Sequence, residues 1–142
     1  MSNYFSDKQV KLLAEAKSSK NYVHLKNENQ SLKDIMNLKN LNKIISMHNC
    51  WDRNNFSLVL DKNIIPFPSF STDGNDLGFS KTSPDPIKVG NYIKKGASLV
   101  LNDLIYLSKD IQLLADDLQI ITNGKCQANL YFSMQSHQAF AP

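Results

Sequence analysis

Residues 125–142, KCQANLYFSMQSHQAFAP, carry the clearest structural pattern in the chain. Over the first nine of these residues apolar and polar side chains alternate, which is the period of a β-strand with one covered face. The apolar set is Cys126, Ala128, Leu130 and Phe132. The polar set is Gln127, Asn129, Tyr131 and Ser133. The pattern predicts a strand over residues 125–133, followed by a loop, with amide, phenol and hydroxyl groups on the uncovered face.

The segment before this strand predicts helix, strand and helix in turn. Asp85 followed by Pro86 is a strong helix start, and Gly96 is suited to end that helix. Residues 97–101 form an apolar strand, and Ser108 caps a second helix that ends at Gly124. Because no glycine-rich phosphate loop follows either strand, the alternation does not indicate a parallel nucleotide-binding sheet.

The N-terminal part predicts two helical segments. Ser6 with Gln9 three residues later forms a capping box, which indicates a helix that ends near residues 17–19. Helical spacing of apolar residues returns from Ser31 to Ile45, and Asn40 is expected to divide this second segment into two pieces.

Short strands and one long loop complete the expected order of elements. Residues 22–25 and 56–60 are strand candidates, residues 61–63 form a turn, and residues 64–66 resume the strand. Residues 67–85 contain proline, serine, glycine and aromatic residues without any period. Loops of this length are uncommon and are often functional, and the aromatic residues favour an ordered loop.

Composition places the chain among ordinary globular proteins and disfavours several functional classes. A length of 142 residues with 42% hydrophobic and 20% charged residues is sufficient for one domain with a buried core. The net charge is +3 and Arg53 is the single arginine, so we predict no specific nucleic-acid surface. The chain shows neither a signal peptide nor an apolar run that could span a membrane, so we expect a cytoplasmic location.

The two cysteines, Cys50 and Cys126, do not predict a disulfide framework or a metal centre. There is no CxxC pair and no cluster of cysteine and histidine, the pattern that a structural zinc site requires. His137 has no carboxylate or thiol near it in sequence, so it is expected to be an exposed loop residue. Asp116 and Asp117 point about 100° apart on a helix and therefore do not form an acid–base pair.

Three motifs follow one another over residues 86–142. KGASLVLNDL at 95–104 comes after a helix, NLYFS at 129–133 forms the last strand, and SHQAFAP occupies 136–142. In order and spacing they resemble the Gly-Ala-Thr-Leu-Val-Leu-Asn, Asn-x-Tyr-x-Thr and Gly-Ser-Gln-Gly-Phe-x-Pro passages of the JmjC/cupin-type oxygenases, the group that includes the ribosomal oxygenases. Residues 51–66 resemble that family's N-terminal strands more loosely.

The sequence departs from the family pattern at three positions. Family members tend to have Thr at Ser133, Pro at Met134 and Gly at Ala139. Ser133 keeps the hydroxyl group. Ala139 loses the freedom of glycine to adopt a positive φ, so the loop is expected to follow a different path.

The resemblance implies an α+β chain that forms part of a double-stranded β-helix, the cupin or jelly-roll fold. Residues 1–142 would be a single unit, with a helical N-terminal cover over 1–55 and the first barrel strands and helices over 56–142. Such enzymes bind Fe(II) through a His-x-Asp/Glu…His triad and use 2-oxoglutarate. The first of these ligands would directly follow Pro142. Fe(II) and 2-oxoglutarate are therefore expected for the complete protein, and this chain alone is expected to bind neither and to contain no catalytic or metal residue.

The resemblance also assigns Asn129, Tyr131 and Ser133 to the binding of substrate or co-substrate. The same alternation has a simpler explanation, because a half-exposed strand places polar residues toward solvent. Two functions follow: an oxygenase that hydroxylates a side chain of a protein, peptide or small molecule, or a non-catalytic binding or dimerisation module. In either case the strand edge at 125–133 is expected to be covered by a C-terminal half of the protein or by a partner chain, such as a second copy in a homodimer.

Overall fold

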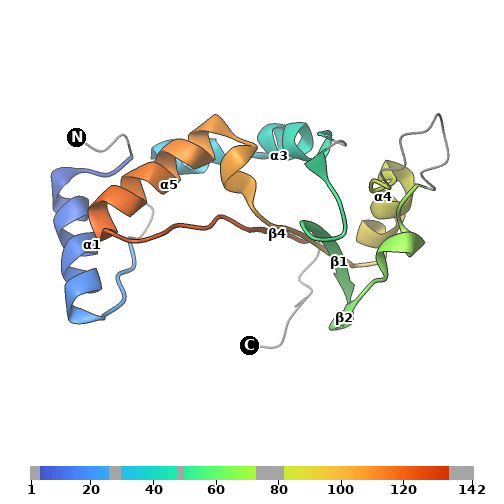
Figure 1. The fold of residues 1–142 in the computed structure, drawn as a ribbon, viewed down its shortest axis with the longest axis horizontal. Coiled ribbons are helices and arrows are strands. Elements are labelled where there is room, and N and C mark those ends of the chain that lie inside the picture. The colour runs from blue at the N-terminus through green and yellow to red at the C-terminus, as the bar shows by residue number, and fades with distance from the viewer. Residues whose placement is uncertain (1–3, 26–29, 48–49, 73–81, 135–142) are drawn as a thin grey trace. The chain divides into compact units, whose positions relative to one another are not determined.

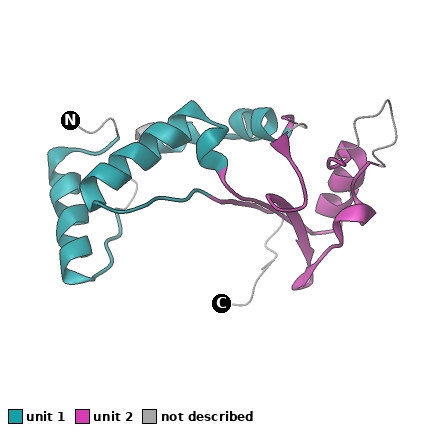
Figure 2. Ribbon diagram, in the orientation of Figure 1, with its two compact units in different colours: residues 1–45, 104–128 teal, residues 46–103, 129–142 magenta. Residues whose placement is uncertain are grey.

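The computed structural model describes residues 4–25, 30–47, 50–72 and 82–134. The chain divides into two compact units, and each unit combines two separated parts of the sequence (Figure 2). The helical unit contains residues 1–45 and 104–128, and the sheet unit contains residues 46–103 and 129–142. The division predicted from the sequence at residue 55 stays a prediction.

The helical unit is built on the packing of its first and last helices. Helix α1 spans Asp7–Ser19 and lies against α5, which spans Lys109–Thr122 (Figure 1). The short 3₁₀-helix η3 at Leu104–Tyr106 also contacts α5. Helices α2, at Gln30–Ile35, and α3, at Leu38–Ile45, complete this unit.

The capping box predicted for α1 is confirmed. The Gln9 N–H donates to Ser6 Oγ at 3.4 Å, and the Ser6 N–H donates to Gln9 Oε1 at 2.9 Å. Gln9 is buried, so its amide satisfies the start of the helix out of contact with solvent. The helix ends at Lys20, which has a φ of 54°.

The second helical segment is divided into α2 and α3, as predicted. The division lies between Ile35 and Leu38, so the prediction that it lies at Asn40 is wrong. Asn37 lies between α2 and α3, and its Oδ1 accepts a hydrogen bond from the Asn40 N–H at 2.9 Å. Asn40 Nδ2 donates to the carbonyl oxygens of Asp34 and Ile35 at 3.1 and 3.0 Å, at the end of α2. Asn37 therefore starts α3, while the Asn40 side chain closes α2.

Helix α5 begins where the sequence predicts and ends one residue earlier than expected. The Ile111 N–H donates to Ser108 Oγ at 3.5 Å, which confirms Ser108 as the N-cap. At the other end Asn123 adopts a φ of 48° and ends the helix, whereas the sequence predicts an end at Gly124. Asparagine tolerates this left-handed conformation better than most residues, which explains the shift.

Asp117 connects α5 to the segment that precedes α1. Its side chain is buried, and its Oδ2 accepts a hydrogen bond from the Tyr4 N–H at 3.2 Å. The Tyr4 hydroxyl donates to the Asp110 carbonyl oxygen at 3.3 Å. Burial raises the pKa of the Tyr4 phenol, and the negative charges of Asp110 and Asp117 add to this effect.

The sheet unit contains one antiparallel sheet in the order β2-β1-β3-β4. The strands are β1 at Phe56–Leu60, β2 at Asn63–Ile64, β3 at Ser98–Leu101 and β4 at Leu130–Phe132 (Figure 1). Helix α4, at Pro86–Lys94, contacts β1, and the 3₁₀-helix η2 spans Phe67–Ser69. The chain is thus α+β, and its antiparallel pairing confirms that the alternation of helix and strand did not indicate a parallel sheet.

Several predicted strands differ from those observed. The strand predicted at residues 64–66 is observed as β2 at Asn63–Ile64, and the strand predicted at 97–101 begins at Ser98. Residues 22–25 form no strand, and Tyr22 is 93% exposed, so this segment lacks a surface on which a strand could pack. The strand predicted over 125–133 pairs only at Leu130–Phe132. Its neighbour β3 ends at Leu101, and the chain turns at Asp103 with a φ of 59°, so the residues before Leu130 have no continuing β3 partner.

The β1–β2 hairpin turns through Asp61 and Lys62, two of the three residues predicted to form the turn, whereas Asn63 already belongs to β2. These two residues have φ values of 51° and 65°, which is the backbone of a type I′ turn. Leu60 pairs with Asn63 on either side of the turn. Asparagine and glycine are the usual residues here, so Lys62 adopts a conformation that its side chain disfavours.

The core of the sheet unit comes from the central strands and a cluster of aromatic rings. Leu58 on β1 and Leu99 on β3 are directly opposite each other and fully buried. The Phe56 ring centroid lies 5.8 Å from that of Trp51 and 6.0 Å from that of Phe70. These contacts account for the burial of Phe70, which belongs to the segment predicted to be a loop.

The long loop before α4 is fixed at its two ends. The Thr72 N–H donates to the Ser83 carbonyl oxygen at 2.9 Å, and the Asp85 N–H donates to the Phe70 carbonyl oxygen at 2.8 Å. Asp85 Oδ1 accepts from two backbone N–H groups of α4, which confirms this residue as the predicted N-cap. Phe79 lies outside the described residues.

Candidate functional site

The segment that contains β4 has a polar side, which is called the polar side of β4 below. It consists of Gln127, Asn129, Tyr131 and Ser133, all of which are exposed. The intervening residues Cys126, Ala128, Leu130 and Phe132 are half-buried. The predicted alternation therefore extends along the whole segment, although only its centre is paired with β3. Three of the residues on the polar side are those that the family resemblance assigns to ligand binding.

Asn129 also contacts the backbone that leaves β3. Its Oδ1 accepts a hydrogen bond from the Asp103 N–H at 3.3 Å. The next N–H group along the chain, that of Leu104, donates to the Ala128 carbonyl oxygen at 3.0 Å. Two consecutive N–H groups are thus bonded to two consecutive residues before β4, which fixes the position of Asn129.

Tyr131 lies directly opposite Val100 on β3, and Val100 lies opposite Ser57 on β1. Residues that face each other in an antiparallel pair project from the same face of the sheet. Val100 is buried, whereas Tyr131 is 60% exposed. Tyr131 therefore places its phenol on the same face as Val100, at the end of the sheet where that face becomes accessible.

Ser133, on the same side, is exposed just beyond β4. His137 and the remainder of the SHQAFAP motif lie outside the described residues. Asp116 is exposed while Asp117 is buried, so their carboxylates do not converge.

The polar side of β4 offers hydrogen-bonding groups but no metal ligand set. Within the part of the chain that the structure describes, no three histidine, cysteine, aspartate or glutamate side chains come together as a metal would require. Cys50 and Cys126 are free thiols. Amide, phenol and hydroxyl groups of this kind can orient an organic ligand by hydrogen bonding.

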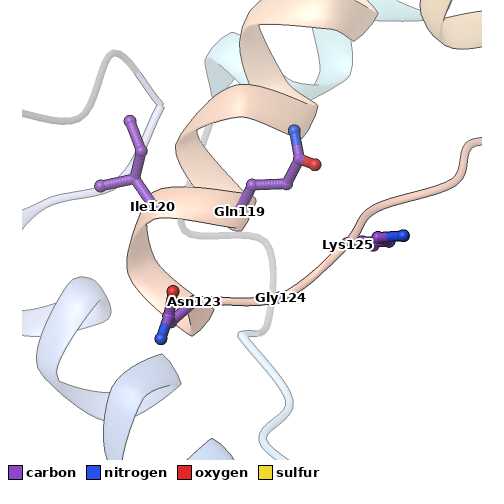
Figure 3. A pocket seen from close by; sticks show the side chains of 5 residues that line it. All are labelled: Gln119, Ile120, Asn123, Gly124 and Lys125. Atoms are coloured by element: carbon purple, nitrogen blue, oxygen red, sulfur yellow. The ribbon is translucent and has the colours of Figure 1, made fainter.

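A hollow of about 480 Å³ lies at the end of α5 (Figure 3). It is lined by Gln119, Ile120, Asn123, Gly124 and Lys125. All five residues come from one short segment, and the side chains in Figure 3 point in different directions rather than toward a common point. None of them is buried, so the hollow is a weaker candidate than the polar side of β4.

The sequence identified the residues on the polar side of β4 but missed the partner of Asn129. Asp103 reads as a turn residue, and 26 residues separate it from Asn129. An available signal was the Asn-Asp pair directly after β3, because both residue types tolerate left-handed turns that bring distant backbone groups together.

Comparison of the chain with protein-family models, with curated protein sequences and with solved structures finds no match. Among the described residues, no helix has both the length and the apolar character needed to cross a membrane.

Proposed function

We propose that this chain forms part of an Fe(II)- and 2-oxoglutarate-dependent oxygenase, which hydroxylates a side chain of a protein, peptide or small molecule. The observation that carries the proposal is the exposure of Asn129, Tyr131 and Ser133. They occupy alternate positions of the segment containing β4, the edge strand of an antiparallel sheet, in the Asn-x-Tyr-x-Ser order of the resembled motif.

The order of elements gives further support. Helix α4, strand β3, helix α5 and strand β4 follow one another as the resemblance requires, and β3 pairs antiparallel with β4. Cupin and jelly-roll barrels are built from antiparallel strands, so this pairing is compatible with the first strands of such a barrel.

The role proposed for the polar side of β4 is to orient a ligand. The amide of Asn129, the phenol of Tyr131 and the hydroxyl of Ser133 would hold the substrate or co-substrate by hydrogen bonds. Fe(II), 2-oxoglutarate and O₂ would supply the oxidation chemistry. The described residues form no iron site, and we assign them no step at the metal. In the proposal the iron ligands follow Pro142 in the complete protein, which acts in the cytoplasm.

The first test is to read the coding sequence downstream of residue 142. The proposal expects a His-x-Asp or His-x-Glu motif directly after Pro142 and a further histidine later. A continuation without this motif, or a stop codon, would count decisively against the proposal.

The second test measures succinate formed from 2-oxoglutarate by the full gene product with Fe(II). Replacing Tyr131 with Phe removes one hydroxyl group, and we expect turnover to fall by about tenfold or more, the effect of losing one positioned hydrogen bond of about 1.5 kcal/mol. Tyr22→Phe is the matched control, because Tyr22 is a 93% exposed tyrosine in the helical unit. Equal turnover in the two variants would remove Tyr131 from the site.

A non-catalytic dimerisation module is the second candidate, and exposed apolar side chains favour it. Leu38 at the start of α3 is 70% exposed and Ile87 in α4 is 76% exposed. The dimerisation alternative uses the helical segments at 31–47 and 86–95 for partner contacts, and each of these two residues lies in one of them. Light scattering should then give the mass of a dimer that Leu38→Glu or Ile87→Glu converts to a monomer. A monomeric protein that binds Mn(II) and 2-oxoglutarate would exclude this candidate.

A further inference from the structure

The amide of Asn129 has a defined direction. An asparagine side chain has one end that only accepts hydrogen bonds, Oδ1, and one end that only donates them, Nδ2. The partner on the β3 side is the Asp103 N–H, which is a donor, so Oδ1 must face it. The Nδ2 end therefore points away from Asp103, and no hydrogen bond from it is found to any described residue.

The surrounding backbone holds the amide in this direction. Asp103 has a φ of 59°, so the chain turns sharply between its own N–H, which donates to Asn129, and the N–H of Leu104. The adjacent bond from the Leu104 N–H to the Ala128 carbonyl oxygen, at 3.0 Å, keeps the two segments together. A flip of the Asn129 amide would place two donors against each other, which is unfavourable because neither would then be satisfied.

We propose that Asn129 meets its ligand through Nδ2, as a hydrogen-bond donor, so that the ligand group beside that end of the amide is an acceptor, namely a carboxylate or carbonyl oxygen. The inference deepens the proposed function and rests on it for the presence of a ligand at this place. A carboxylate would belong to the co-substrate and a carbonyl oxygen to the substrate, and both are acceptors.

The test uses three five-carbon probes that differ in polarity. Glutarate carries charged acceptors, N,N,N′,N′-tetramethylglutaramide carries neutral acceptors, and 1,5-diaminopentane carries only donors at neutral pH. The readout is the ¹⁵N-edited NMR signal of the Asn129 side-chain amide in the wild-type protein. We expect a saturable shift with at least one acceptor probe and none with the diamine. A response to glutarate alone assigns the carboxylate, and a response to the tetramethyl diamide alone assigns the carbonyl.

Substitution of Asn129 separates ligand binding from a purely structural role. Asn129→Asp keeps an oxygen that can accept from the Asp103 N–H but removes the donor end. We expect it to melt like the wild type and to bind the acceptor probe at least tenfold more weakly. Asn129→Ala loses both contacts and should also melt at a lower temperature. Asn91→Asp is the matched control, since it makes the same change at an exposed position on α4.

Three results would overturn the inference: a response to the diamine in preference to the acceptors, no response to any probe, or undiminished binding of the acceptor probe by Asn129→Asp. These results are independent of turnover. An amide that responds to an acceptor in a protein that forms no succinate would uphold the direction of Asn129 while removing the oxygenase assignment.

Discussion

Strands β3 and β4 are neighbours in one sheet, yet they differ in how they are covered. Every residue of β3, from Ser98 to Leu101, is buried. In β4 the side chains alternate, with Tyr131 exposed between the half-buried Leu130 and Phe132. The difference follows from their sequences, since SLVL is almost wholly apolar whereas NLYFS alternates.

This difference shows that stability and ligand contact can be separated within a few residues. Strand β3 pairs on both sides, with β1 and β4, so its side chains carry the packing of the sheet. The polar side of β4 is exposed, so we expect substitutions there to cost less stability than substitutions in β3. The first two predictions below compare a residue of β3 with one of β4, and the third separates stability from activity at a single residue of β4.

The largest expected difference is between Leu99→Ala and Leu130→Ala. Leu99 is fully buried, so removing its side chain should cost about 2–5 kcal/mol of unfolding free energy, including the cavity left behind. Leu130 is only half-buried, and the same change there should cost about 1 kcal/mol. Urea denaturation of both variants measures the two values. Equal losses would show that β4 is packed as tightly as β3.

A smaller difference is expected between Val100→Thr and Tyr131→Thr, which change two residues directly opposite each other. Threonine has the shape of valine, but its hydroxyl would be buried at position 100 and should cost about 1–3 kcal/mol. At the exposed position 131 threonine keeps a good strand former, and the loss should stay below about 1 kcal/mol. Thermal melting followed by circular dichroism checks both, and the comparison fails if Tyr131→Thr is the more damaging change.

The smallest expected effect on stability is that of Tyr131→Phe. Removing one hydroxyl from a largely exposed ring should change the unfolding free energy by no more than about 0.5 kcal/mol. The same variant is expected to lower turnover strongly, so a pair of measurements on one protein, melting and activity, separates the two roles. A marked fall in melting temperature would instead give the Tyr131 hydroxyl a structural role.

Local signals in the sequence predicted the helix starts well. Ser6, Asp85 and Ser108 each cap the helix that follows, because the donors and acceptors involved lie within three residues of one another. The length of β4 could not be predicted in this way. It depends on where β3 ends and turns at Asp103, which is a property of a distant segment.

The candidate site was predictable in part for the same reason. The alternation of polar and apolar residues along 125–133 predicted which side chains are exposed, because successive side chains of an extended backbone point in opposite directions. The contact between Asn129 and Asp103 joins segments 26 residues apart, with the whole of α5 between them. The Asn-Asp pair after β3 indicates a turn, but it does not specify which distant residue the turn contacts. The folded chain shows that the Asn129 amide is bonded there at one end.

The interleaving of the two units has a consequence for synthesis of the protein. Helix α1 is made early but packs against α5, and β1 and β3 are made before β4 completes their sheet. Neither unit has all its parts until the ribosome has passed the second half of the chain. The first helices are therefore synthesised before the segments that cover their apolar surface. Binding by chaperones during this interval would protect them from aggregation.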